Sequence, residues 1–345
     1  MNSRYSRPAM RIHVKNNHAS PETFPPTPEG EAVFTITRER FDAAAARHPH
    51  VASHLDVFID WDLERFETSM RTAEVLVTWD LPTAELARVA PNLRLIHIIG
   101  AGVEHLCPMD WVPPGVTVVN NRGAHADKAG EFGLMTVLML HNRLPAVIGN
   151  QRRAHWESLY STPIGGRTLL VIGTGSIGGA VARRCRTLGM RVLGVSRHGR
   201  PHDAVDEMHT TDRLDALLPR ADFVFLATPL TPETRNLLDA RRQALMKRGA
   251  GVVNVGRSAT VDYDALAANL CGGHLSGAVL DVFDPEPLPS DSPLWSVPNL
   301  VVTPHISADD GDSYVALTLD LVFRNLERLL EGRPLMNVVR PELGY

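Results

Sequence analysis

Residues 168–185, TLLVIGTGSIGGAVARRC, decide the fold of this chain of 345 residues. An apolar run typical of a buried strand leads into glycines at G-x-G-x-x-G spacing (Gly173, Gly175 and Gly178), and a helix is expected over 177–188. The first glycine allows a tight turn, the second lets a pyrophosphate approach the backbone, and the third lets the helix pack against the strand. Free N–H groups at the helix start would face the phosphates. This context favours a dinucleotide-binding turn over a merely structural glycine turn.

The end of the next strand bears on the choice of dinucleotide. An NAD-binding unit carries an acidic residue about 20 positions after the glycines, where it binds the ribose. Here the strand at 191–195 is followed by Ser196, Arg197 and His198, with no carboxylate. Serine and arginine would bind a 2′-phosphate through charge-assisted hydrogen bonds. Ser196 and Arg197 therefore predict that NADP(H) is preferred, with NAD(H) possible. The alternative is an ordinary surface arginine, since only three of the 35 basic residues are lysines.

Strands and helices alternate on both sides of this turn. We expect strands at 10–14, 55–59, 75–78, 93–99 and 116–119, and a second series at 169–172, 191–195, 223–227, 252–255, 278–282 and 300–302. Helices are expected over 39–47, 63–72, 83–90, 126–144 and 313–330, a loop over 20–30 and a loose tail over 1–9. This order predicts an α/β protein with two doubly wound parallel sheets.

Length and composition restrict the class further. The length predicts about two domains, and 44% hydrophobic residues supply enough apolar material for their cores. No apolar run is long enough to cross a bilayer, and no secretory signal is visible. The net charge of −4 argues against a dedicated nucleic-acid binder. Cys107, Cys185 and Cys271 are too far apart in sequence to suggest a disulfide framework or a metal site, so we expect no metal and a cytoplasmic protein.

Three reactive side chains each follow a predicted strand of the second series. Arg257 lies in VNVGRSATVD, Glu286 in LDVFDPEPLP and His305 in TPHISADD. Ligands of doubly wound sheets bind beyond the carboxyl ends of the strands, so we expect the three to converge beside the glycine turn. Singly, each has an ordinary interpretation: a buried histidine, an exposed loop acid, or an arginine paired with Asp262.

Together, these three groups suit interconversion of a ketone and an alcohol beside a dinucleotide. A histidine can donate the proton near neutral pH, and a carboxylate on its far nitrogen stabilises the charged ring. An arginine fork binds a substrate carboxylate. The cofactor carries the redox chemistry, while the protein positions and protonates the substrate.

Several separated motifs resemble one family. They include IIGAGVEHL, GRTLLVIGTGSIGGAVA, ATPLTPETRNLL, VNVGRSATVD, GAVLDVFDPEPLP and PLWSVPNLVVTPHIS, within a match that runs from about residue 93 to 339. The chain resembles the D-isomer-specific 2-hydroxyacid dehydrogenases, which include glyoxylate/hydroxypyruvate reductases and phosphoglycerate dehydrogenases. The first ninety residues match only in their rhythm of strands and helices.

The resemblance implies a role for each motif. His305 would be the proton donor or acceptor, Glu286 its acidic partner and Arg257 the substrate-binding arginine. The backbone of Ala101, Gly102 and Val103 would hold the substrate carboxylate. Further cofactor contacts would come from Thr174, Ser176, Ile177, Thr228, Pro229, Val255, Gly256, Asp281 and His305. Asp281 would face the nicotinamide amide or brace the following turn. Trp79 follows the strand expected at 75–78 and could either line the substrate pocket or pack in the core.

The family layout is discontinuous. A flavodoxin-like substrate domain would comprise 10–121 and 306–345, a Rossmann coenzyme domain 122–305, and the active site the cleft between them. The helix near 126–144 would form a homodimer interface, although its apolar run could equally be core. Asp309 and Asp310 stand after His305 where relatives commonly have a glycine pair, and the sequence gives no reason for them.

The sequence therefore predicts hydride transfer between NADP(H) and C2 of a small 2-oxo or 2-hydroxy acid of the D series, with glyoxylate or hydroxypyruvate as the best candidate. One alternative is a dinucleotide-sensing binding module of the corepressor type. Another is NAD(P)-dependent oxidation of a different small anion, such as formate or phosphite. The expected partner is the small-molecule substrate, with neither nucleic acid nor membrane.

Overall fold

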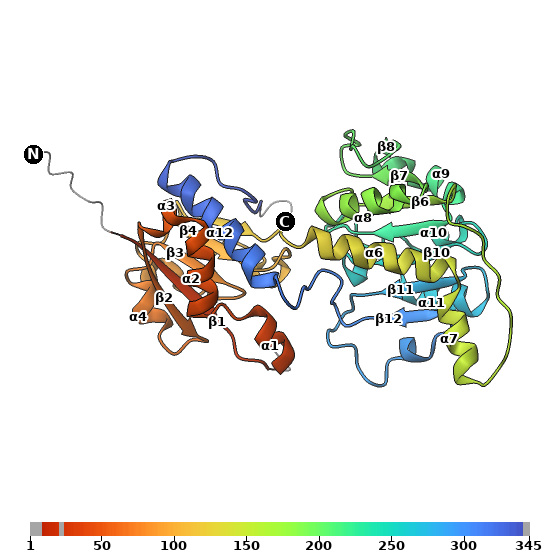
Figure 1. Cartoon of the computed structure of the whole chain (residues 1–345), viewed down its shortest axis with the longest axis horizontal. Helices are drawn as coiled ribbons and strands as arrows, with labels where there is room; N and C mark the ends of the chain where they lie inside the picture. The colour runs from red at the N-terminus through yellow and green to blue at the C-terminus, as the bar shows by residue number, and fades with distance from the viewer. Residues whose placement is uncertain (1–8, 21–23, 341–345) are drawn as a thin grey trace, which may run out of the picture. The chain divides into compact units, whose positions relative to one another are not determined.

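The computed structural model describes residues 9–20 and 24–340 and contains two compact units (Figure 1). Unit 1 comprises Met1–Ala124 and Asp310–Tyr345, and unit 2 comprises His125–Asp309. Each is built on one parallel sheet, of five strands in unit 1 and seven in unit 2. The predicted α/β class with two parallel sheets is confirmed. The predicted domain bounds and cleft stay predictions, and residues 1–8 of the predicted tail lie outside the described residues.

Unit 1 contains a sheet in the order β2-β1-β3-β4-β5. Its strands are β1 (Met10–Asn16), β2 (Leu55–Trp61), β3 (Val75–Thr78), β4 (Leu95–Ile98) and β5 (Thr117–Asn120). Its helices are α1 (Pro28–Phe34), α2 (Arg38–Arg47), α3 (Pro49–Ala52), α4 (Phe66–Met70), α5 (Leu86–Val89), the 3₁₀ turn η1 (Glu104–Leu106) and α12 (Tyr314–Leu330). Strands β3 and β4 are buried along their whole length, as expected where helices cover both faces of a parallel sheet.

Helix α12 completes unit 1 although the whole of unit 2 separates it in sequence from strands β1 to β5. Its apolar stripe, which includes Leu319, Val322 and Phe323, packs into the same core cluster as Ile12 and Val14 of β1. The N-terminal strands therefore need the C-terminal helix to complete their core.

Unit 2 contains a sheet in the order β12-β11-β10-β9-β6-β7-β8. Its strands are β6 (Thr168–Ile172), β7 (Arg191–Val195), β8 (Glu207–His209), β9 (Phe223–Leu226), β10 (Gly251–Asn254), β11 (Gly277–Leu280) and β12 (Leu300–Val302). Its helices are α6 (Ala126–His141), α7 (Leu144–Arg152), α8 (Ser176–Thr187), α9 (Leu214–Leu217), α10 (Ala240–Ala244) and α11 (Tyr263–Cys271), with 3₁₀ turns η2 (Thr211–Arg213), η3 (Leu218–Arg220), η4 (Ser258–Thr260) and η5 (Pro293–Ser296).

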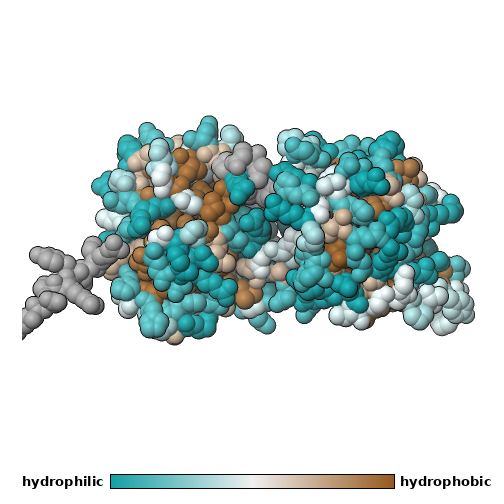
Figure 2. All heavy atoms as spheres, turned by 90° about the horizontal axis from the view of Figure 1, so that it is seen from above, coloured by the Kyte–Doolittle hydropathy of each residue, from teal (hydrophilic) through white to brown (hydrophobic). Residues whose placement is uncertain are grey.

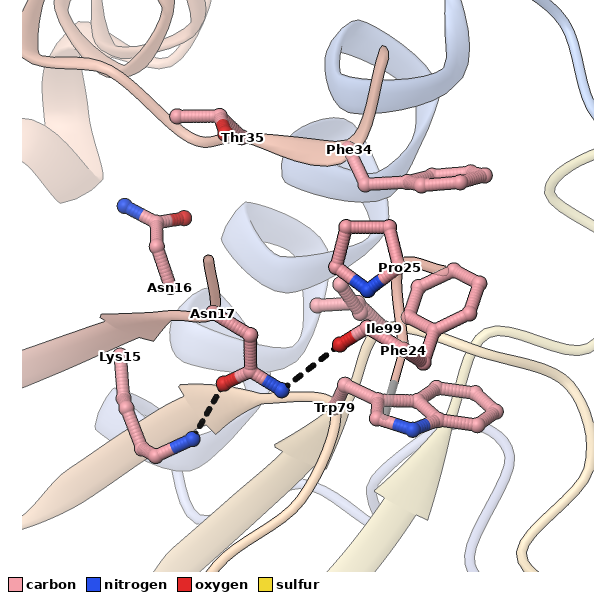
Figure 3. A pocket seen from close by; sticks show the side chains of 9 residues that line it. All are labelled: Lys15, Asn16, Asn17, Phe24, Pro25, Phe34, Thr35, Trp79 and Ile99. Atoms are coloured by element: carbon pink, nitrogen blue, oxygen red, sulfur yellow. Dashed lines mark hydrogen bonds between the residues drawn. The ribbon is translucent and has the colours of Figure 1, made fainter. Parts of the chain in front are cut away.

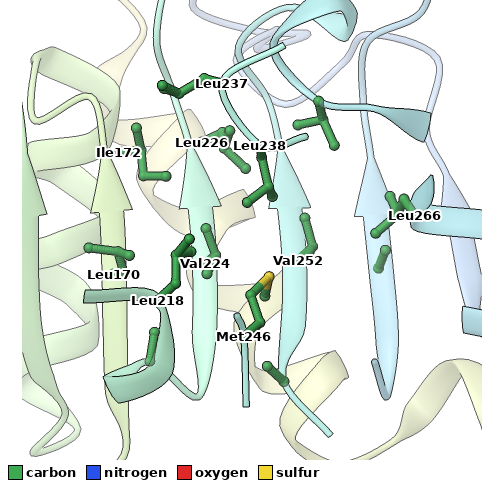
Figure 4. Close-up of a cluster of buried hydrophobic side chains, with 14 of the residues drawn as sticks. Leu170, Ile172, Leu218, Val224, Leu226, Leu237, Leu238, Met246, Val252 and Leu266 are labelled. Carbon is green, nitrogen blue, oxygen red and sulfur yellow. The ribbon is translucent and has the colours of Figure 1, made fainter. Parts of the chain in front are cut away.

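Two apolar clusters hold the unit 2 sheet. In Figure 4, strand residues such as Leu170, Val224 and Val252 meet Leu218 and Met246 from the covering segments. The other cluster packs α6 and α8 against the opposite face, with Phe132 and Val181 among its members. Because the strands of this sheet are parallel, the carboxyl ends of all seven lie along one edge.

Several predicted elements differ from the structure. The helix expected over 126–144 ends at His141, and a further helix, α7, begins at Leu144, because Arg143 adopts a left-handed φ of 55° and Pro145 stands in the first turn of α7. The loop expected over 20–30 ends at α1, which begins after Thr27 accepts a hydrogen bond from the Gly30 N–H at 3.1 Å. The helices expected over 63–72 and 83–90 shrink to α4 and α5, and β8 was not expected.

The apolar residues are concentrated inside the units. Figure 2 shows one face on which hydrophilic residues predominate and apolar residues form smaller patches. Within the described ranges, no single helix is both long and apolar enough to cross a membrane. Helices α6 and α7 together meet that test but are bent by 65°.

The buried His97 predicts that unit 1 loses stability in acid. It is fully buried in β4, and burial lowers its pKa to about 4, against a weaker opposing effect from its contact with Asn121. The ring is neutral in the fold but charged in the unfolded chain between about pH 4 and 6.5, so its contribution is present at higher pH and lost as pH falls. His97→Leu should therefore reduce the stability lost between pH 8 and pH 5 by about 2 kcal/mol.

Urea unfolding of both proteins at the two pH values measures this difference. His50→Leu removes an exposed histidine and is the control. An equal loss of stability in wild type and His97→Leu would contradict the prediction.

Candidate active site

The glycine turn between β6 and α8 has the geometry of a phosphate cradle. Gly173 has a φ of 95°, and a Cβ there would lie 2.6 Å from the Ala227 carbonyl oxygen. A Cβ on Gly178 would lie 2.0 Å from the Gly173 carbonyl oxygen, so strand and helix pack too closely for a side chain. Beside Gly175, by contrast, a Cβ would meet nothing within 4 Å. Gly175 is the N-cap of α8 and makes no side-chain cap bond, which leaves N–H groups at the helix start for an anion.

Neighbouring strand ends complete the cradle. After β9, the Thr228 hydroxyl is buried and has no hydrogen-bond partner among the described residues. After β10, Val255 is buried, and a Cβ on Gly256 would lie 2.6 Å from the Thr228 carbonyl oxygen. A buried hydroxyl without a partner is costly unless a ligand or water satisfies it. Thr174, Ser176, Ile177 and Pro229 lie in the same two loops, and this set of residues fits a dinucleotide.

The two residues expected to recognise a 2′-phosphate follow β7. The Ser196 backbone N–H donates to the His209 carbonyl at 3.1 Å, which fixes the start of the loop. The Arg197 Nη2 atom lies 3.8 Å from Glu233 Oε2, and both side chains are partly or largely exposed. An ion pair of this length between exposed groups contributes little to stability, so the Arg197 side chain could move to contact a phosphate.

His305 and Glu286, which follow β12 and β11, form a direct pair. The His305 Nδ1 atom lies 2.8 Å from Glu286 Oε2, and Glu286 Oε1 accepts a hydrogen bond from the Phe283 N–H at 2.7 Å. The carboxyl group is thus held from both sides. The Nε2 atom of the half-exposed His305 ring remains on the side away from Glu286, where a substrate oxygen would meet it.

The pair is electrostatically coupled. Burial favours the neutral ring of His305, but the hydrogen bond and the charge of Glu286 outweigh it and raise the pKa of His305 above its ordinary value. Burial likewise favours the protonated acid of Glu286, but its contacts with His305 outweigh it and lower the pKa of Glu286. The charge of Arg257 contributes to the lowered pKa of Glu286 and partly opposes the rise at His305, so the guanidinium is close enough to act on both. Unit 2 therefore brings the three predicted side chains together.

Asp281 braces the loop that carries His305. It is fully buried, and its carboxyl oxygens accept hydrogen bonds from the Thr303 hydroxyl at 2.6 Å and from the N–H groups of Ile306 and Ser307, both at 3.0 Å. His305 lies between these partners with a left-handed φ of 55°. Of the two alternatives for Asp281, the structure shows the bracing contact.

The loop of Arg257 is held by residues that the sequence analysis did not select. The Arg257 carbonyl accepts hydrogen bonds from Asn254 Nδ2 at 3.1 Å and from the Thr260 hydroxyl at 2.7 Å. Asn254 Nδ2 also contacts the Tyr263 hydroxyl, which donates to the Val282 carbonyl at 2.9 Å. One buried network therefore links the strand ends of Arg257 and Glu286. The only hint in the sequence is Asn254, a polar residue that ends a buried strand.

The other predicted substrate residues belong to unit 1. Ala101, Gly102 and Val103 form the turn between β4 and η1, and Asn120 Nδ2 donates to the Ala101 carbonyl at 2.7 Å. Trp79 follows β3 and stacks on His105, with ring centroids 4.2 Å apart. The turn is therefore fixed at the carboxyl edge of the five-stranded sheet.

Comparisons with known proteins show which family the chain is similar to. Residues 134–307 match the model of the D-isomer specific 2-hydroxyacid dehydrogenase, NAD binding domain. A D-3-phosphoglycerate dehydrogenase of Mycobacterium tuberculosis is 34% identical over 256 residues, which cover 73% of this chain and 48% of that protein. The chain thus spans about half the length of the first curated relatives it matches.

Two further similarities extend over most of both proteins. A glyoxylate reductase of Thermofilum pendens is 31% identical over 79% of this chain and 84% of its own length. The crystal structure of a D-isomer specific 2-hydroxyacid dehydrogenase from Xanthobacter autotrophicus, in complex with NADPH and MES, has a TM-score of 0.80 and 29% identity, covering 98% of this chain and all of that one. On this evidence the chain belongs to the D-isomer specific 2-hydroxyacid dehydrogenase family.

Proposed function

We propose that the protein is an NADP(H)-dependent D-2-hydroxyacid dehydrogenase that acts on a small 2-oxo or 2-hydroxy acid of the glyoxylate or hydroxypyruvate kind. The observation that carries the proposal is the 2.8 Å contact between His305 and Glu286, beside the charge of Arg257 and in the unit that holds the glycine turn. A protein that only binds a dinucleotide would not need a histidine whose pKa is raised and whose ring is oriented by a carboxylate.

The side chains divide the chemistry among them. A bound nicotinamide dinucleotide would supply or accept the hydride at C2. His305 then donates a proton to the substrate oxygen from Nε2, or takes it in the reverse direction, while Glu286 stabilises the charged ring. Arg257 binds the substrate carboxylate, and its positive charge favours the negative charge that develops on the neighbouring oxygen.

The preference for NADP(H) rests on the end of β7. Ser196 and Arg197 stand where an acid would repel a 2′-phosphate, and the Arg197 guanidinium can donate charge-assisted hydrogen bonds to that group. The NADPH complex of the similar Xanthobacter structure supports this assignment. The relatives' names differ in substrate, and the small acids are favoured here by the glyoxylate reductase that covers most of this chain.

We also infer a homodimer formed through α6, α7 and the segment after them. Met135, Leu144 and Val147 are exposed on these helices, while Trp156 and Tyr160 are 95% and 86% exposed. Large apolar side chains left in water near one another mark interaction surfaces.

The three cysteines are free thiols, as a reducing cytoplasm would keep them.

A panel of short 2-oxoacids, each assayed with NADPH and NADH, tests the proposed reaction and cofactor. We expect oxidation of NADPH with higher kcat/KM than of NADH. Arg197→Ala should lower kcat/KM for NADPH about tenfold or more, since a charge-assisted hydrogen bond contributes about 1.5–3 kcal/mol, and leave NADH nearly unchanged. Arg248→Ala, another exposed arginine, is the control. The proposed activity is wrong if no oxoacid supports oxidation of either cofactor.

The pH profile tests the role of the pair. Reduction requires protonated His305, so kcat/KM should fall as pH rises through the raised pKa of His305. Glu286→Gln removes the charge that raises this pKa and should move the alkaline limb to lower pH by about one unit or more. His305→Ala should lower kcat by about 10²–10⁴-fold with cofactor binding retained. Asp291→Asn, an exposed acid of the same loop, is the control, and an alkaline limb unmoved in Glu286→Gln argues against the pair.

Analytical ultracentrifugation at micromolar concentration tests the interface. Trp156→Ser should shift the sedimenting species from dimer toward monomer, because the change removes the most exposed aromatic side chain of the segment. Trp295→Ser is the matched control, since Trp295 is also exposed but lies in η5. A wild-type protein that sediments as a monomer would refute the inferred dimer.

A further inference from the structure

A small pocket lies at the carboxyl edge of the unit 1 sheet (Figure 3). It is lined by residues that end or follow β1, β3 and β4, among them Lys15, Asn17, Trp79 and Ile99. The order β2-β1-β3-β4-β5 reverses direction between β1 and β3. In doubly wound sheets, the crevice at such a switch point is where ligands bind.

The polar side of the pocket is built around a buried lysine. The Lys15 side chain is 3% exposed, and its Nζ atom lies 2.7 Å from Asp80 Oδ1 and also donates to Asn17 Oδ1. Asn17 Nδ2 in turn donates to the Phe24 carbonyl at 2.9 Å and to Asp80 at 3.0 Å. An ammonium group has three N–H donors, and the partners described here take two. The amine is therefore held in place with one donor to offer a ligand.

The apolar side consists of three aromatic rings. Phe24 lies 4.5 Å from Trp79 and 4.5 Å from Phe34, measured between ring centroids. Figure 3 shows the Phe24 ring between those of Phe34 and Trp79, with Pro25 beside it. These rings limit the length of any group that enters.

The pocket adjoins the turn expected to hold the substrate carboxylate. A Cβ on Gly100 would lie 2.2 Å from the Trp79 ring, so the indole packs directly on the residue that precedes Ala101. Ile99 lines the pocket, and Ala101, two positions later, begins the turn. A substrate bound by its carboxylate at this turn thus has the pocket as its neighbour within unit 1.

The size and polarity of the pocket select among substituents. Its volume of about 20 Å³ leaves room for one water-sized group. A second carboxylate or an aromatic ring is too large. A methyl group fits, but it cannot accept a hydrogen bond from the third N–H donor of Lys15. A hydroxyl group of similar size can accept that hydrogen bond.

We propose that this pocket binds the C3 hydroxyl of a three-carbon 3-hydroxy-2-oxoacid, with Lys15 and Asn17 as the specificity-determining residues. The inference rests on the proposed function and narrows its substrate class to hydroxypyruvate rather than glyoxylate or pyruvate. Glyoxylate has no substituent to place in the pocket, and pyruvate has one that cannot hydrogen-bond. A site built to bind a hydroxyl discriminates strongly against an analogue that lacks it.

Steady-state kinetics of the full-length protein with NADPH and each of the three oxoacids test this. Wild type should favour hydroxypyruvate over pyruvate by about tenfold or more in kcat/KM. Lys15→Met keeps the length of the side chain and removes its donors, so kcat/KM for hydroxypyruvate should fall about tenfold while glyoxylate stays within about twofold. Lys247→Met is the matched control, because Lys247 also pairs with an aspartate, Asp222, at 3.0 Å but lies in unit 2.

The outcomes are distinguishable. Equal losses on all three substrates in Lys15→Met would show a structural role and overturn the inference, as would a wild-type preference for pyruvate. Asn17→Ala repeats the test if Lys15→Met does not fold, and the wild-type ranking needs no variant. Absence of turnover with every oxoacid would overturn the proposed function, and this inference with it.

Discussion

The candidate site depends on one buried carboxyl group. Asp281 ends up inside the protein because β11 is buried throughout, and a buried carboxyl group is tolerated only when its oxygens are satisfied. Three donors from the loop after β12 satisfy it: the Thr303 hydroxyl and the backbone N–H groups of Ile306 and Ser307. These contacts offset the cost of a non-glycine residue with positive φ. The loop that carries these donors also carries His305, whose ring lies 2.8 Å from Glu286, so the hydrogen bonds to Asp281 hold the backbone on which the candidate pair depends.

The same logic extends along the sheet edge. Parallel strands bring their carboxyl ends to one edge, but the loops that follow need cross-links before their side chains are held to within a fraction of an ångström. Tyr263 provides one such link, since its hydroxyl joins Asn254, which precedes Arg257, to the carbonyl of Val282, which precedes Glu286. Asp281 links β11 to the β12 loop. Arg257, Glu286 and His305 come from three different loops, and two buried polar residues register these loops against one another.

Sequence reasoning succeeded where a local pattern has one physical interpretation. The glycines of 173–178 and the alternation of strands and helices determine a parallel sheet, so the α/β class followed directly. The predictions were incomplete where contacts between residues far apart in the sequence determine a residue's role or the end of a helix. The residues around Asp281 do not show whether its carboxyl group braces a loop or faces a ligand. The groups that donate hydrogen bonds to it lie more than twenty residues later in the sequence. The break between α6 and α7 was missed because the apolar run of α6 outweighed the signal of Pro145. Lys15 carried no prediction, because the aspartate that pairs with it, Asp80, lies sixty-five residues later in the sequence.

The two aspartates after His305 separate into different roles once the fold is known. Asp310 belongs to the start of α12, where its carboxyl oxygens accept hydrogen bonds from the N–H groups of Asp312 and Ser313, and its charge complements the positive end of the helix. Asp309 lies on the unit 2 side of the boundary, near the charges of His305, Asp281 and Lys128. Burial raises the pKa of Asp309 to about 6, and His305 opposes this shift. The charge of Asp309 therefore depends on its surroundings, because burial and the neighbouring charges of His305, Asp281 and Lys128 act on its pKa in opposite directions.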